Sequence, residues 1–424
     1  MKFFDRPLFV IETPQRIEPA RLQDVPEAIS DLIAELSAIT AKLESSLHPA
    51  TASSLAKMVR IMNTYYSNLI EGHVTRPRDI ERAIAFAPAA SDVPQTVAIE
   101  HALAGGADQG GRARSLLIEA VAHVRVQESI DRMFAAGKLP EPASMEFVSY
   151  LHREFYKGAS EEMLQVRGQV ETFIIIPGHF REQPSQDVSV GRPVPPGSER
   201  VADFMAYFEK RYEFAMLGKA ARILAIPAAH HRFNYIHPFT DGNGRVSRLM
   251  SHAMAHAAGI GAHGLWSISR GLARGLRNRS DYKLMMDHAD TARQGDLDGR
   301  GNLSQRALVE FIEWFLKVCI DQVSFMADLF QIGTLSKRLR SYVERSQTLR
   351  PESARLLEEA LGRGEVDRGE LSRITGLPER SARRILSAVI AEGLLASNTP
   401  KGPVSLRFPV AAQDILFPRL FAEP

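Results

Sequence analysis

Apolar residues recur at three- and four-residue spacing along most of the chain. Between residues 26 and 47, and again between about 53 and 72, the apolar positions fall on one side of a helix with 3.6 residues per turn. The second stretch ends at Gly72, and glycine readily takes the left-handed conformation that closes helices. The pattern therefore predicts a mainly α-helical protein.

The same periodicity continues to about residue 330. It predicts helices at about 113–135, 143–156, 199–216, 219–235, 244–258, 280–292 and 304–330. The exception is the segment 173–190, where an apolar run at 173–176 precedes Pro177 and Gly178, and Val188 and Val190 alternate with polar residues. This segment predicts a short pair of strands.

Beyond residue 350 the elements become shorter. Helices are predicted at 351–362, 367–374 and 379–392, followed by strands near 394–395 and 404–408. This order is typical of a winged helix-turn-helix, whose recognition helix here would carry Arg380, Arg383 and Arg384. Binding of DNA and a role in protein contact or dimerisation both remain open for this segment.

The chain as a whole is predicted to have three regions. They are an N-terminal helical region at 1–110, a central region at 111–330 and a winged-helix region at 331–424. Positive charge is concentrated in the last region: residues 331–408 carry 14 Lys or Arg and 9 Asp or Glu, and 14 minus 9 leaves an excess of 5.

Composition narrows the class of protein further. Lys and Arg number 52 and Asp and Glu 50, and the net charge of +2 argues against a general binder of nucleic acid or membrane. The single cysteine, Cys319, excludes an internal disulfide. No apolar run approaches the length of a membrane span, and Lys2 and Asp5 interrupt the apolar start. We expect a cytoplasmic protein without a membrane segment.

Residues 237–248 combine the residue types that phosphate chemistry needs. Gly242 and Gly244 let the backbone approach an anion closely, and the helix predicted to begin there presents unpaired amides and the positive end of its dipole. Arg245 and Arg248, three residues apart on that helix, can grip phosphate oxygens from one side. The loop therefore predicts a polyphosphate site.

Three further side chains complete this loop. Asp241 is a hard oxygen ligand suited to Mg²⁺, and Asn243 adds an amide. His237 can take a proton from an attacking hydroxyl, because imidazole titrates near neutral pH. A Gly-Asn-Gly turn alone would indicate only a helix start, but so many functional groups in twelve residues favour a catalytic site.

Residues 237–248 resemble the Fic family, whose motif HPFx[DE]GNGRxxR they match at every position. The resemblance implies a helical core that binds ATP with Mg²⁺ and transfers AMP to a Ser, Thr or Tyr hydroxyl of a target protein. It implies that His237 is the base and Asp241 the Mg²⁺ ligand. The phosphate-binding residues would be Asp241, Gly242, Asn243, Gly244, Arg245 and Arg248.

The resemblance also implies a β-hairpin flap that pairs with the target and an adenine-binding helix. Gly178, Arg181, Val188 and Val190 lie where that flap is expected, although a purely structural hairpin is the alternative. Tyr282 is the expected adenine contact. Many members carry Asn near the position of Arg293, and this departure leaves the preferred nucleotide base open.

An inhibitory motif is the last feature of the resemblance. Ser67, Glu71 and Gly72 fit the family pattern [S/T]xxxE[G/N], which implies that Glu71 pairs with Arg248 and that ATP then binds unproductively. A solvated glutamate at a helix end is the alternative.

Two other functions are alternatives to AMP transfer. One is a transcription regulator in which the core only senses nucleotide, and the other is removal of AMP from modified protein. Partners expected from the sequence are ATP, a protein target that includes the protein itself, DNA or protein at the C-terminal region, and a second copy in a homodimer.

His252 and His256 have the spacing of zinc ligands on a helix. The three residues between them are Ala253, Met254 and Ala255, and they lack the glutamate of an H-E-x-x-H site. A zinc site is therefore not predicted for this pair.

Overall fold

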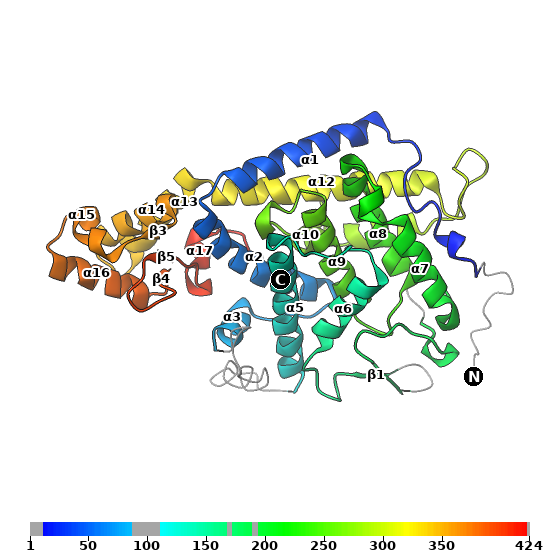
Figure 1. Cartoon of the computed structure of the whole chain (residues 1–424), viewed down its shortest axis with the longest axis horizontal. Coiled ribbons are helices and arrows are strands. Elements are labelled where there is room, and N and C mark those ends of the chain that lie inside the picture. Colours follow the sequence, from blue (N-terminus) through cyan, green and yellow to red (C-terminus); the bar gives the residue numbers. More distant parts are fainter. Residues whose placement is uncertain (1–11, 87–110, 168–171, 189–193, 422–424) are drawn as a thin grey trace. The chain divides into compact units, whose positions relative to one another are not determined.

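The computed structural model describes residues 12–86, 111–167, 172–188 and 194–421 (Figure 1). Most of these residues are helical, and the strands form two small antiparallel sheets. The predicted mainly α-helical fold is confirmed. No helix in the described ranges is long and apolar enough to cross a membrane.

Each predicted helix is present, and the described residues contain four further α-helices, at 77–86, 268–274, 332–345 and 413–416, that were not predicted. The α-helices are α1 Glu27–Ser45, α2 Pro49–Ile70, α3 Pro77–Phe86, α5 Gly111–Ala135, α6 Met145–Tyr156, α7 Val201–Arg211, α8 Lys219–Ile236, α9 Asn243–Ala257, α10 Ile268–Arg274, α11 Asp281–Ala289, α12 Gln305–Phe330, α13 Ile332–Arg345, α14 Glu352–Arg363, α15 Leu371–Thr375, α16 Glu379–Ala391 and α17 Gln413–Leu416. The strands are β1 Gln165–Arg167, β2 Thr172–Ile174, β3 Glu365–Val366, β4 Leu395–Ala396 and β5 Val404–Leu406.

The predicted strand pair at 173–190 is only half right. β2 begins at Thr172, but its partner is β1, with Val166 opposite Phe173. Residues 176–188 instead form a turn and a 3-10 helix at Pro184–Gln186. Pro177 and Pro184 lack the amide hydrogen that a strand ladder needs. Val190 lies outside the described residues.

The chain forms two compact units that do not follow chain order. The first draws on residues up to 35, on 125–260 and on 271–319. Its centre is the pair α8 and α9, which pack along each other (Figure 1). Both helices are buried on nearly all sides, as the core helices of a helical domain are.

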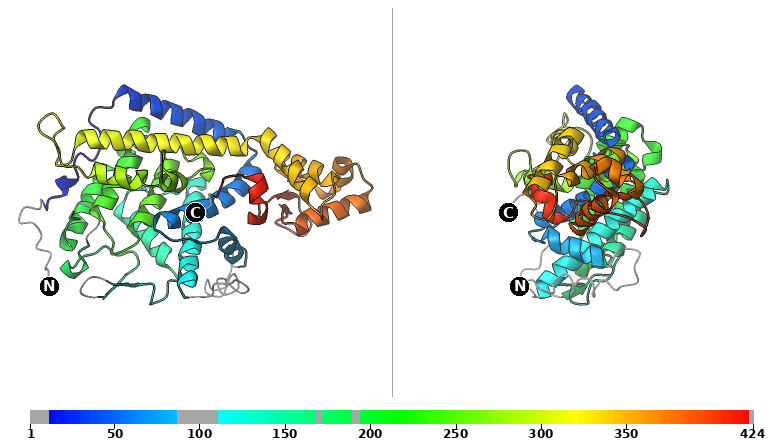
Figure 2. Two further views of the ribbon diagram at one scale, coloured as in Figure 1. Left: turned by 180° about the vertical axis from the view of Figure 1, so that it is seen from behind. Right: turned by 90° about the vertical axis from the view of Figure 1, so that its left-hand side faces the viewer.

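The second unit contains α2 and α3 and the C-terminal elements from α13 onward. Its sheet has the order β3-β5-β4, and α14, α15 and α16 pack on one another beside it (orange in Figure 2). A turn at Gly376, with φ 71°, joins α15 to α16. The three consecutive regions expected from the sequence stay a prediction.

Candidate functional site

The loop between α8 and α9 begins and ends with a left-handed residue. His237 follows the last residue of α8 with φ 52° and ψ 61°, and Gly242 precedes α9 with φ 79°. A Cβ atom on Gly242 would lie 3.0 Å from the ring of Tyr156. Both conformation and space therefore require glycine there. A non-glycine residue in this region costs about 1 kcal/mol or more, and such strain is concentrated at functional sites.

The side chain of Asn243 closes the loop. Its Oδ1 accepts from the amide of Phe239 at 2.9 Å, and its Nδ2 donates to the Phe239 carbonyl at 2.8 Å. The Phe239 ring is completely buried. The Asn243 amide group thus fixes the backbone of the loop, and the predicted amide at the phosphate site would come from the Asn243 main chain.

Arg181 holds the backbone of the loop by hydrogen bonds. Its buried guanidinium donates to the carbonyl groups of His237 at 2.7 Å and Ile236 at 3.0 Å, to Pro196, and to the hydroxyl of Ser198. The last carbonyls of a helix have no partner within the helix, and a cation is favoured at that end. The structure thus shows Arg181 positioning this loop, and its expected contact with a target stays a prediction.

His152 connects the loop to the turn after β2, and no pattern in the sequence pointed to this residue. Burial lowers the pKa of His152 to about 4, so the ring is neutral. Its Nδ1 accepts from the amide of Gly178 at 2.8 Å, which leaves Nε2 to donate to the Asp241 carbonyl at 3.3 Å. The ring also stacks on Phe239 with 3.9 Å between centroids.

Gly178 has φ 85°, and a Cβ atom there would lie 3.1 Å from the Cβ of Arg153. It is therefore a structural turn residue of the expected flap. Val188 is half-buried and lies in no strand.

The carboxylate of Asp241 lies half exposed at the mouth of the loop. Burial alone would raise its pKa, but the Arg245 guanidinium at 3.4 Å, the Gly242 amide and the Tyr156 hydroxyl at 2.9 Å hold the pKa of Asp241 below its ordinary value. An ionised and accessible carboxylate fits a Mg²⁺ ion that bridges phosphate oxygens.

The first turn of α9 supplies most groups of the candidate phosphate site. The amides of residues 243–245 belong to the first turn, where no carbonyl of the helix can accept from them. Arg245 and Arg248 are 5% and 1% exposed, and the Arg245 guanidinium lies 4.9 Å from the centre of the Phe155 ring. Amides, helix dipole and two cations thus favour an anion at this end.

The imidazole of His237 is half-buried beside these groups. Its Nδ1 lies 3.4 Å from the carbonyl oxygen of Asn234 in the last turn of α8. A carbonyl can only accept, so this contact favours the tautomer with hydrogen on Nδ1. The lone pair then lies on Nε2, as a general base requires.

Tyr282 is held in place by His230. Ser251 donates its hydroxyl to the Ser247 carbonyl at 2.8 Å, so it accepts from Nδ1 of His230 at 2.9 Å. The opposite nitrogen of His230 then accepts from the Tyr282 hydroxyl at 2.8 Å. Burial, with the nearby charge of Arg248, lowers the pKa of His230 to about 3. The ring of His230 is therefore neutral while it bonds to Ser251 and Tyr282. The expected contact of Tyr282 with the adenine base stays a prediction.

The residues of the expected inhibitory motif lie in the second unit. Ser67 is buried within α2, Glu71 is the exposed residue after its end, and Gly72 has φ 77°. The helix end at Gly72 was predicted correctly. The inhibitory role of Glu71 stays a prediction.

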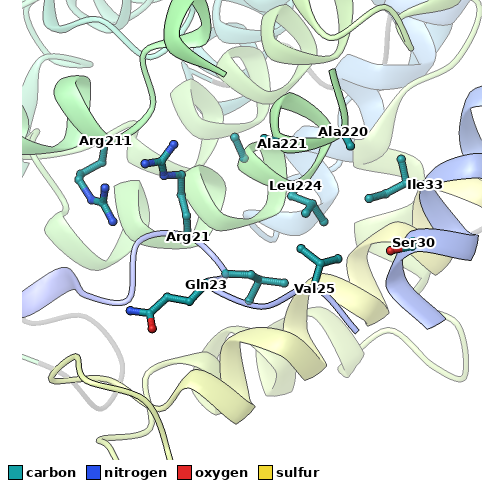
Figure 3. Close-up of a pocket in the computed structure, with 11 residues that line it drawn as sticks. Arg21, Gln23, Val25, Ser30, Ile33, Arg211, Ala220, Ala221 and Leu224 are labelled. Atoms are coloured by element: carbon teal, nitrogen blue, oxygen red, sulfur yellow. The ribbon is translucent and has the colours of Figure 1, made fainter. Parts of the chain in front are cut away.

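A pocket of about 560 Å³ lies elsewhere in the first unit (Figure 3). Arg21 and Arg211 line one part of it, and Val25, Ile33 and Leu224 line another. None of its lining residues belongs to 237–248, so it is not part of the candidate site.

Comparison with known proteins finds similarity over the candidate site. Residues 142–255 match the model of the Fic/DOC family. This part of the chain is distantly related to Fic protein adenylyltransferases. The chain is 35% identical over 82 residues to Protein adenylyltransferase Fic of Drosophila erecta and 38% identical over 84 residues to that of Aedes aegypti. Each alignment spans 19% of this chain and 16% of the relative.

Solved structures of Fic proteins are also similar. A Fic family protein from Desulfovibrio desulfuricans has a TM-score of 0.48 and 17% identity, and the alignment covers 91% of this chain and 98% of that one. A Fic domain containing signaling protein from Bacteroides thetaiotaomicron has a TM-score of 0.47 and 18% identity, with 71% and 96% covered.

Replacing Arg181 with Met should leave the carbonyl groups at the end of α8 without their donors. We expect the free energy of unfolding to fall by about 3 kcal/mol in urea titrations, as for other buried charged networks that lose one member. Arg200→Met is the matched control, because Arg200 forms only a half-exposed pair with Asp203 and its loss should cost less than about 1 kcal/mol. Equal losses in the two variants would contradict the bracing role.

The neutral state of His152 predicts a pH dependence of stability. Below about pH 6.5 the unfolded chain binds a proton at this residue, and the folded protein does not until about pH 4. Stability should therefore fall as pH drops through this window, and His152 should contribute up to about 1.4 kcal/mol per pH unit. Unfolding curves of His152→Gln between pH 7 and 4.5 should show a shallower slope than wild type, and parallel slopes would contradict the assignment.

Proposed function

We propose that this protein transfers AMP from ATP to a hydroxyl group of a protein. The observation that carries the proposal is the loop at 237–242. It brings together the imidazole of His237, an ionised Asp241, the amino end of α9 and the Arg245 guanidinium. A base, a metal ligand and an anion site within one loop are the parts that nucleotidyl transfer needs.

In the proposed reaction the target hydroxyl attacks the α-phosphorus of ATP. A bond forms between the hydroxyl oxygen and that phosphorus, and the bond from phosphorus to the oxygen bridging the α- and β-phosphates breaks. Nε2 of His237 takes the hydroxyl proton, and pyrophosphate leaves with the electron pair. Asp241 would hold Mg²⁺, which supplies charge neutralisation for the phosphates.

The edge of β2 that faces away from β1 is the proposed docking place for the target. β2 pairs with β1 through Phe173 and its neighbours. Ile174 is 65% exposed and Ile176 is 54% exposed, which is unusual for isoleucine and typical of a surface that a partner covers. An extended segment of the target could add to this edge by main-chain hydrogen bonds.

Glu71 is proposed as an inhibitor of this activity. The support is the sequence pattern with Ser67 and Gly72 and the position of Glu71 directly after the end of α2. A carboxylate that occupies Arg248 would deprive ATP of a γ-phosphate partner. The wild-type protein would then bind ATP and turn it over slowly.

Glu71→Gly should therefore increase self-labelling by ATP carrying a radioactive α-phosphate, at least tenfold over wild type in the presence of Mg²⁺. The gain should vanish when His237→Ala is added, and mass spectrometry should find the mass of AMP on a Ser, Thr or Tyr. Glu344→Gly is the matched control, because Glu344 is an exposed glutamate in the last turn of α13.

Two outcomes would separate the parts of this proposal. Labelling that survives His237→Ala would contradict the base. Equal labelling of wild type and Glu71→Gly, with both lost in His237→Ala, would support transfer and contradict inhibition.

DNA binding is a second candidate function for the C-terminal elements. α16 follows α15 after a short turn and exposes Arg380, Arg383 and Arg384. An exposed basic helix after such a turn is the arrangement that enters the major groove in helix-turn-helix proteins. Arg383 pairs with Glu379 on the same helix, so Arg380 and Arg384 are the stronger candidates for phosphate contact.

The double variant Arg380→Ala and Arg384→Ala should weaken binding to duplex DNA. If both guanidinium groups contact phosphates, the slope of log K against log salt should become less negative by about 2. Arg306→Ala, which removes a similarly exposed arginine in the first unit, should leave the slope unchanged. No retention of the wild type on DNA at low salt would reject this function.

A further inference from the structure

We propose that Asp131, His252 and His256 bind a divalent transition metal ion of the zinc type. The two histidines come from α9 and the aspartate from the last turns of α5. The three residues each direct one ligand atom to a common point. This site is separate from the Mg²⁺ site proposed at Asp241.

The distances among the three ligand atoms carry the proposal. Oδ1 of Asp131 lies 2.7 Å from Nε2 of His252 and 3.0 Å from Nε2 of His256, and the two nitrogen atoms are 3.2 Å apart. Ligand atoms of a tetrahedral zinc ion lie about 3.3 Å apart, because each is about 2.0 to 2.2 Å from the metal. The triangle would therefore accept an ion after outward shifts of a few tenths of an ångström.

The types of ligand atom indicate which metal ions the cluster would bind. Two imidazole nitrogens and one carboxylate oxygen suit zinc, cobalt and related ions, whereas Mg²⁺ prefers oxygen ligands. The side chains of His256, His252 and Asp131 are 1%, 6% and 12% exposed. Three protein ligands leave one tetrahedral position for water or another ligand.

Other contacts hold the ligands in place. Phe134, one turn after Asp131, stacks on the ring of His256 with 4.5 Å between centroids and 27° between planes. His252 and His256 are four residues apart, so both rings project from one face of α9. The bound ion would thus tie the carboxyl-terminal part of α5 to the helix that carries Arg245 and Arg248.

Hydrogen bonding is the competing explanation for the cluster. Two neutral histidines can each donate Nε2–H to one carboxylate oxygen without any metal. The two explanations differ in what a variant does: Asp131→Asn keeps an oxygen acceptor for both rings but removes the charge that a metal ion needs. The same change should therefore weaken metal binding at least tenfold and leave the fold intact.

The experiment uses the full chain after dialysis against a chelator. Addition of Co²⁺ should give the visible absorption of a tetrahedral cobalt site, saturating at one ion per chain, and Zn²⁺ should remove it while excess Mg²⁺ should not. The melting temperature should rise by several degrees with Zn²⁺. Asp131→Asn, His252→Ala and His256→Ala should each weaken binding at least tenfold, with circular dichroism as the check on folding.

His263→Ala and His288→Ala are matched controls. Each removes an exposed histidine that pairs with a glutamate, His263 with Glu44 and His288 with Glu310, and neither should change the cobalt signal. Absence of the signal in the wild type would overturn the proposal and leave hydrogen bonding as the explanation. A signal of equal strength in Asp131→Asn would overturn it as well.

Discussion

The candidate site depends on which groups donate hydrogen bonds to the buried carbonyl groups at the carboxyl end of α8. The chain must leave this helix at His237 in the left-handed conformation, while the carbonyl groups of Ile236 and His237 still need donors. One guanidinium, from Arg181, supplies hydrogen bonds to both. The backbone of the candidate loop is therefore held by a residue 56 positions away in the sequence.

The sequence could predict the features that depend on local chemistry. Periodicity located α14 and α16 to within a residue, since a helix with one buried face shows it in any short window. The motif at 237–248 was visible because its residues are contiguous. Gly72 at the end of α2 was predictable for the same reason. The family match over 142–255 agrees with this part of the interpretation.

What could not be predicted depends on contacts between distant segments. Arg181 and His152 have no spacing pattern that links them to the loop, and Asp131 lies 121 residues before His252. The partner of β2 was misassigned because Val188 and Val190 alternate as strand residues do, whereas the pairing is decided by Val166. Periodicity reports which face of an element is apolar, but it does not report what that face meets.

The neutral ring of His152 restricts which side chains can occupy position 152. One end must accept a hydrogen bond from Gly178 and the other must donate one to Asp241, in a place that water does not reach. A lysine can only donate and a carboxylate can only accept. Among the other natural amino acids, asparagine and glutamine carry a separate donor and acceptor on one side chain, as the neutral imidazole does. The turn that follows β2 and the loop at 237–242 are thus joined at a position that very few side chains could occupy.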